Sequence, residues 1–165
     1  MAVSEVMHVG MSELKVAPGP SKLAAYGIGS CVVLALWDPG SGLGGMVHSM
    51  LPTSEGQSDG AQRPEKYCDS AVGALLDALE LAGARRERCV ASMAGGATMF
   101  AMPSRVKGPA TIGERNLTST RDSLRVLNLT LAAQDCGGER GRSMEMDCSD
   151  GSVRVWSAAQ APRRL

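Results

Sequence analysis

Apolar residues in the first third of the chain form short runs that turn residues interrupt. The run Cys31–Trp37 is β-branched near its start and bounded by turn residues, which predicts a buried strand. Asp38–Ser41 is a turn sequence, and Leu43–Met50 is predicted to be the returning strand of a hairpin. Further strands are predicted at 9–16, as an edge strand, and at 23–26.

Two later segments carry an apolar stripe with the period of an α-helix. The stripes consist of Val72, Leu75, Leu76 and Leu79, and of Leu117, Thr120, Leu124 and Leu127. Asp69 is the predicted N-cap of the first helix and Gly83 its C′ residue, while Asn116 is the predicted cap of the second. A polar loop at 51–64 precedes the first helix, and a loop at 103–109 precedes the second.

The remaining strands are predicted at 88–94 and 129–133 and in a C-terminal hairpin. Asp150-Gly151 is a typical two-residue turn, which places Cys148 opposite Val153. The tail 158–165 is predicted to be frayed.

Strands and helices interleave, and much of the sheet is built from hairpins. We therefore expect one mixed α/β or α+β layered domain over 1–165, with its core at about 10–157. Its sheet should be largely antiparallel or mixed and packed by two main helices.

Composition excludes several classes of protein. The 165 residues hold 17 basic and 17 acidic side chains and only 3% aromatic residues, which argues against nucleic-acid binding. No apolar run approaches the ~18–20 residues that span a bilayer, and no secretory leader pattern begins the chain. We expect a cytoplasmic protein without direct membrane insertion.

The five cysteines are Cys31, Cys68, Cys89, Cys136 and Cys148. Their number is odd and no CxxC pair is present, so neither a disulfide framework nor a structural zinc site is expected. No P-loop or dinucleotide-binding fingerprint is present, and we expect neither a cofactor nor a metal. With only two histidines, a catalytic base of the usual kind must be His8 or His48, and His8 is expected to be exposed.

Cys31 and His48 form the candidate catalytic pair. If Pro39 and Gly40 make a two-residue turn, Cys31 faces His48 across the hairpin, on the same side of the sheet. A slip of one residue would place the two side chains on opposite faces, and nearby glycines allow a longer loop. The alternative interpretation is purely structural: Cys31 is a small core residue, and His48 is a hydrogen-bonded residue without a catalytic role.

The turn before Cys31 favours a nucleophile. Gly27-Ile28-Gly29-Ser30 leaves the approach to the thiol open, and backbone N–H groups at Gly29 and Ser30 can stabilise an oxyanion. A cysteine beside a histidine can ionise and attack a carboxamide, giving a thioester that water then hydrolyses.

Ordered blocks over residues 10–155 resemble the CheD family of chemoreceptor glutamine deamidases. The blocks are 27–32, 45–52, 66–69, 94–100, 112–116 and 137–143. The resemblance implies an α/β layered fold, hydrolysis of receptor glutamine side chains to glutamate, and Cys31 and His48 as nucleophile and base. It also implies two partners, the cytoplasmic helices of methyl-accepting chemoreceptors and a CheC-type phosphatase.

One position departs from the family pattern. The family threonine that orients the histidine lies six residues before the cysteine, where this chain has Ala25. Either another hydroxyl, Ser30 or Ser49, takes this role, or the imidazole is oriented less well. The alternative to an enzyme is a non-catalytic chemotaxis module that docks on receptors or on the phosphatase.

Overall fold

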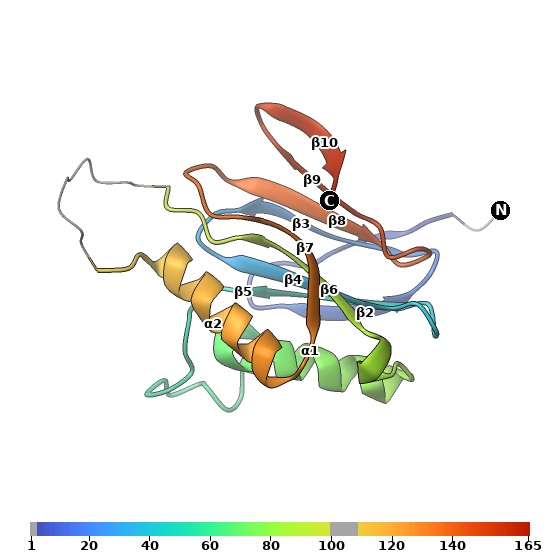
Figure 1. The fold of residues 1–165 in the computed structure, drawn as a ribbon, viewed down its shortest axis with the longest axis horizontal. Coiled ribbons are helices and arrows are strands. Elements are labelled where there is room, and N and C mark those ends of the chain that lie inside the picture. Colours follow the sequence, from blue (N-terminus) through green and yellow to red (C-terminus); the bar gives the residue numbers. More distant parts are fainter. Residues whose placement is uncertain (1–2, 100–108) are drawn as a thin grey trace.

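The computed structural model describes residues 3–99 and 109–165, which form three layers (Figure 1). Two β-sheets pack face to face, and both helices cover the outer face of one of them. The predicted loop at 103–109 lies, except for Pro109, outside the described residues, as does Phe100. The mixed α+β layered fold predicted from the sequence is confirmed.

The helix-covered sheet has the order β2-β5-β4-β6-β7. Its strands are β2 (Leu14–Pro18), β5 (Leu43–Ser49), β4 (Val32–Asp38), β6 (Val90–Gly95) and β7 (Thr130–Cys136). Only β6 and β7 pair in parallel there. The helices are α1 (Cys68–Ala82) and α2 (Ile112–Val126), with 3₁₀ turns at Pro64–Lys66 and Arg86–Arg88.

The second sheet has the order β1-β3-β8-β9-β10. Its strands are β1 (Val6–His8), β3 (Lys22–Ile28), β8 (Arg142–Asp147), β9 (Val153–Ser157) and β10 (Gln160–Arg164). The edge strand predicted at 9–16 had the wrong bounds, because the chain turns at Met11–Ser12 and contributes one strand to each sheet. Residues 14–16 lie in β2, which is an edge strand as predicted. The frayed tail was also wrong, since β10 pairs with β9 and Leu165 packs against the core.

Two apolar clusters separate the layers. Between helices and sheet lie Leu75, Leu76 and Leu79 of α1 and Leu117 and Leu124 of α2, as their stripes predicted. Between the two sheets lies a cluster poor in aromatic residues, referred to below as the inter-sheet cluster. It includes Ala25, Ile28, Val33, Ala35, Met46, Met144 and Met146.

Both predicted hairpin registers were wrong by two residues. Asp38 pairs with Leu43, and Met146 pairs with Val153, so each loop is two residues longer than predicted. In each loop an aspartate begins the turn and a glycine with positive φ ends it. The backbone N–H of Gly42 donates to the Asp38 carbonyl, and that of Gly151 donates to the Asp147 carbonyl. Because the error is an even number, every side chain keeps its predicted face.

The predicted N-caps of both helices were wrong as well. The N-cap of α1 is Tyr67, while Asp69 lies in the first turn and accepts from the Ser54 N–H. The N-cap of α2 is Thr111, which forms a capping box with Glu114. Gly83 ends α1 as predicted, with a left-handed backbone. Neither described helix, at 15 residues each, has the length and apolar character needed to cross a bilayer.

Candidate active site

Cys31 and His48 lie at one end of the inter-sheet space. Cys31 directly precedes β4 and packs against the inter-sheet cluster. His48 lies two residues after Met46 on β5, so its side chain points to the same side, and it is only 3% exposed. His48 pairs with Val33, which makes Cys31 a diagonal neighbour rather than the directly opposite residue that the sequence predicted. Diagonal neighbours lie about 7–8 Å apart, within the reach of an imidazole ring.

The imidazole of His48 is oriented by the main chain. Its Nδ1 lies 3.3 Å from the carbonyl oxygen of Val9. A carbonyl oxygen only accepts hydrogen bonds, so this contact favours the neutral tautomer with its proton on Nδ1 and a lone pair on Nε2. The N–H of Val9 donates to the Ala24 carbonyl at 2.8 Å, which fixes Val9 beside β3. The sequence offered no signal for this contact, because a backbone carbonyl can belong to any residue.

The hydroxyls named from the sequence do not contact the ring in the described structure. Ser49 lies on the opposite face of β5, where its Oγ donates to the Glu65 carbonyl at 2.9 Å. No hydrogen bond of the Ser30 hydroxyl occurs among the described residues. Ala25 is fully buried in the inter-sheet cluster. Val9 therefore supplies the contact for which Ser30 and Ser49 were proposed.

The backbone of the turn before Cys31 is held from two sides. The carbonyls of Gly29 and Cys31 accept from the N–H groups of Ala97 and Gly96, at 3.0 and 2.8 Å. The Ser30 carbonyl accepts from Nδ2 of Asn116 at 2.8 Å. Within the described parts of the chain, no acceptor is bonded to the N–H of Gly29 or of Ser30. Three consecutive carbonyls are thus occupied, while two amide donors stay available.

Two glycines let other segments approach this turn closely. A Cβ on Gly95 would lie 2.1 Å from the Cys31 carbonyl oxygen, and one on Gly113 would lie 2.5 Å from that of Ala97. The turn, the segment after β6 and the first turn of α2 are therefore in direct backbone contact. Side chains at these two glycines would separate them.

Burial sets the resting protonation of the pair. It raises the pKa of the Cys31 thiol and lowers the pKa of His48, so both groups favour their neutral forms. The hydrogen bond to Val9 and the charge of Glu13 oppose the shift at His48, whereas His8 adds to it. This combination suits transfer of the thiol proton to His48 during attack, rather than a stable thiolate beside an imidazolium.

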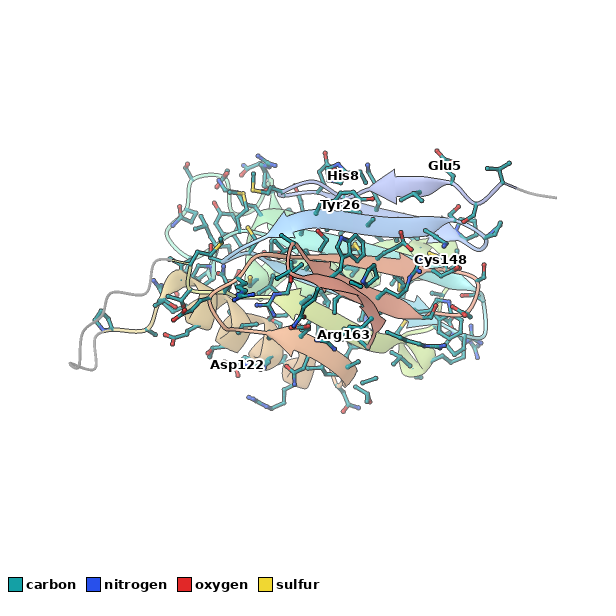
Figure 2. All side chains as sticks on the ribbon, turned by 90° about the horizontal axis from the view of Figure 1, so that it is seen from above. Glu5, His8, Tyr26, Asp122, Cys148 and Arg163 are labelled. Atoms are coloured by element: carbon teal, nitrogen blue, oxygen red, sulfur yellow. The ribbon has the colours of Figure 1, made fainter. Side chains whose placement is uncertain are left out.

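The other cysteines and His8 are placed as the sequence predicted for structural or exposed residues. Cys68, Cys89 and Cys148 are buried, and burial raises their pKa values to about 12, 11 and 11. Cys136 is partly exposed, with a pKa raised by burial to about 11. His8 is exposed on β1 and stacks on Tyr26 of β3, with ring centroids 5.5 Å apart (Figure 2).

A groove between α1 and α2 is the competing location for a site. Its lining includes Pro52, Ser70, Gly73, Arg115, Ser119 and Val126, and it contains neither cysteine nor histidine. The groove therefore offers no thiol–imidazole pair, and Cys31 and His48 remain the candidate pair.

The chain matches known proteins over most of its length. The family model described as CheD chemotactic sensory transduction matches residues 50–157. This match begins two residues after His48, so it rests on parts of the chain other than the candidate pair.

Full-length relatives extend the likeness across the site. A protein of Geobacter metallireducens named probable chemoreceptor glutamine deamidase CheD 2 is 40% identical over 163 residues, 99% of this chain and 100% of that protein. Proteins with the corresponding CheD name from Moorella thermoacetica and Methanococcus vannielii are 42% and 37% identical. They cover 90% and 91% of this chain, which covers 89% and 94% of them.

Proposed function

The chain belongs to the CheD family, and we propose that it hydrolyses glutamine side chains of chemoreceptors to glutamate, with Cys31 as nucleophile and His48 as base. One observation carries the assignment of these roles. The two side chains share the face toward the inter-sheet cluster, and Val9 holds Nδ1 of His48 so that Nε2 is the basic atom. A nucleophile, a base and a group that orients the base are the usual parts of thiol-dependent acyl transfer.

The reaction proceeds through a thioester. Nε2 of His48 takes the thiol proton as Sγ bonds to the carboxamide carbon, and the imidazolium then protonates the departing nitrogen, which leaves as ammonia. Water, deprotonated by the same Nε2, attacks the thioester carbon. The carbon–sulfur bond breaks, the imidazolium returns its proton to Sγ of Cys31, and glutamate is released.

The turn supplies the oxyanion site. Each tetrahedral intermediate places negative charge on the former carbonyl oxygen, and the N–H groups of Gly29 and Ser30 are the donors assigned to it. The hydrogen bond from the Ala97 N–H to the Gly29 carbonyl supports this assignment, because it fixes the peptide plane that carries the Ser30 N–H before substrate arrives.

The names of the relatives support chemoreceptors as the substrate, and the family resemblance supports the cytoplasm as the location. We take the partners to be cytoplasmic receptor helices and a CheC-type phosphatase. A phosphatase that competes with receptors for this protein should slow deamidation as its concentration rises, and excess receptor should relieve the inhibition.

Mass spectrometry of a receptor cytoplasmic fragment tests the proposal. Each glutamine that is converted gains the mass difference between NH₂ and OH when wild-type protein is added. Cys31→Ala and Cys31→Ser should fold and bind the fragment but produce no conversion. Cys136→Ser is the matched control, since Cys136 is the other partly exposed thiol, and it should convert at the wild-type rate.

The substitution of Ala25 for the family threonine keeps the non-catalytic docking module as the competing function. Binding of receptor or phosphatase without conversion by the wild-type protein would establish that function instead. Retained conversion by Cys31→Ala would remove Cys31 from the nucleophile role and leave the reaction class intact.

A further inference from the structure

Asn116 of α2 connects the two segments that carry the candidate pair. Its side chain is fully buried, and Nδ2 donates to the Ser30 carbonyl at 2.8 Å and to the Met50 carbonyl at 3.0 Å. Ser30 directly precedes Cys31, and Met50 follows His48 by two residues. One side-chain amide therefore spans the end of the nucleophile turn and the end of β5.

The other half of the same amide has no partner. Oδ1 of Asn116 is buried without a hydrogen bond, and no other side-chain nitrogen or oxygen of the described residues is in that state. A flipped amide would set Oδ1 against two carbonyl oxygens, so the orientation is fixed by its two acceptors. A buried acceptor without a partner destabilises a fold, and an apolar residue would avoid this penalty. Packing alone therefore does not explain why an asparagine occupies this position. The two hydrogen bonds that its Nδ2 donates do explain it.

We propose that Asn116 is a positioning residue for the deamidation, a role that rests on the proposed function. By holding Ser30 and Met50 at a fixed separation, its amide sets where Cys31 lies relative to Nε2 of His48. It touches neither the substrate nor the reacting atoms. A displacement of 1 Å at a reacting pair can slow a reaction by about 100-fold.

A graded series removes the two donors. Asn116→Ser retains one donor and Asn116→Ala none. Ser119→Ala is the matched control, because Ser119 lies one turn further along α2 and its Oγ donates to the Pro52 carbonyl at 2.6 Å. It also joins α2 to the segment after β5, but no hydrogen bond among the described residues joins it to Ser30.

The first readout is the split between kcat and KM on a receptor fragment. We expect kcat to fall about 100-fold in Asn116→Ala and about 10-fold in Asn116→Ser, with KM within about threefold. Ser119→Ala should keep kcat within about twofold, even where its thermal midpoint drops as far as that of Asn116→Ser. A wild-type kcat in a folded Asn116→Ser would overturn the proposal, whether or not Asn116→Ala folds.

The second readout does not need deamidation, so the two proposals fail separately. Alkylation of Cys31 by iodoacetamide at neutral pH should slow in Asn116→Ala and in His48→Ala. The double variant should be no slower than His48→Ala alone, because the two residues act through one proton transfer. Additive losses, or an unchanged pH profile of alkylation in both Asn116 variants, would assign Asn116 a structural role only. Absence of deamidation by the wild type would refute the proposed function and leave this test valid.

Discussion

Nδ1 of His48 lies within hydrogen-bonding distance, 3.3 Å, of the main-chain carbonyl of Val9, a residue of the segment that joins β1 to β2. The contact crosses 39 residues of sequence. It provides the histidine with the third group that a catalytic base needs, although this chain has an alanine at the family threonine position.

The first prediction concerns the tautomer of His48. Because Val9 can only accept, the neutral ring should carry its proton on Nδ1. Long-range ¹⁵N–¹H NMR of the imidazole at neutral pH should therefore show an unprotonated Nε2. A ring protonated on Nε2 would mean that Val9 does not orient His48 and that Nε2 is not the basic atom.

The second prediction compares the two histidines. His48→Ala should lower kcat for deamidation by about 10²–10⁴-fold, the usual contribution of a general base. His8→Ala should leave kcat within about twofold, because His8 is exposed and stacks on Tyr26 on the outer face of the other sheet. A severe loss in His8→Ala with normal turnover in His48→Ala would reverse the assignment of the base.

Restoring the family hydroxyl is the third prediction. Ala25→Thr should change kcat by less than about twofold, because Val9 already holds Nδ1 of His48. The variant should also lose about 1–3 kcal/mol of unfolding free energy, since Ala25 is fully buried and the added atoms overpack the inter-sheet cluster. Both values come from steady-state kinetics and urea unfolding. A tenfold gain in kcat would show that the wild-type site lacks an orienting group.

The pH profile provides the fourth prediction. Burial lowers the pKa of His48, and the base must be neutral to accept the thiol proton. Activity should therefore persist as the pH falls below the ordinary histidine value of about 6.5, and the acid limb of kcat/KM should have its midpoint below that value. A midpoint above it would indicate a base stabilised in its charged form, as in a thiolate–imidazolium pair.

The fifth prediction uses the two hairpin loops that begin with aspartate. Asp38 is fully buried and accepts from Nε and Nη2 of Arg88 at 2.8 and 2.7 Å, whereas the side chain of Asp147 is 30% exposed beside Lys22. Asp38→Asn should cost about 2 kcal/mol of unfolding free energy. Asp147→Asn should cost less than about 1 kcal/mol.

The pH dependence of the Asp38→Asn difference has a definite sign. Arg88 holds the pKa of Asp38 well below its usual range, so the stabilisation is complete above the unfolded-state value of about 3.9. It should shrink as the pH falls from there toward the folded-state pKa. A difference that stayed constant in acid would show that the ion pair does not contribute through charge.

The layers could be read from the sequence, whereas the strand registers could not. Apolar stripes at helical spacing assigned Leu75, Leu79, Leu117 and Leu124 to the core, because burial follows the period of the element. Both hairpins follow the sequence Asp-x-x-x-Gly, in which the aspartate side chain accepts from the N–H two residues later. Two-residue turns were predicted at Pro39-Gly40 and Asp150-Gly151. Glycines near the first turn indicated that a longer loop was possible, but the aspartate that initiates each loop was not recognised as its signal.

The candidate pair was found from residue types, but its supporting groups were not. Cys31 and His48 stand out because the chain has only two histidines and a glycine-rich turn precedes the cysteine. Asn116 was interpreted as a helix cap, although Thr111 and Glu114 have the spacing of a capping box. Its true partners, Ser30 and Met50, are 86 and 66 residues away, and local pattern carries no information about such contacts.

The same sequence separations determine when, during synthesis, the chain can assemble the candidate active site. Ser30 and Met50 leave the ribosome long before Asn116, and Gly96 and Ala97, which hold Cys31 and Gly29, also follow late. Until α2 has been synthesised and has docked, Asn116 cannot join Ser30 to Met50, although β4 can already pair with β5. A chain truncated before α2 would lack both Asn116 and the strands β7–β10, so we expect it to have no deamidase activity, and activity would report completion of the fold.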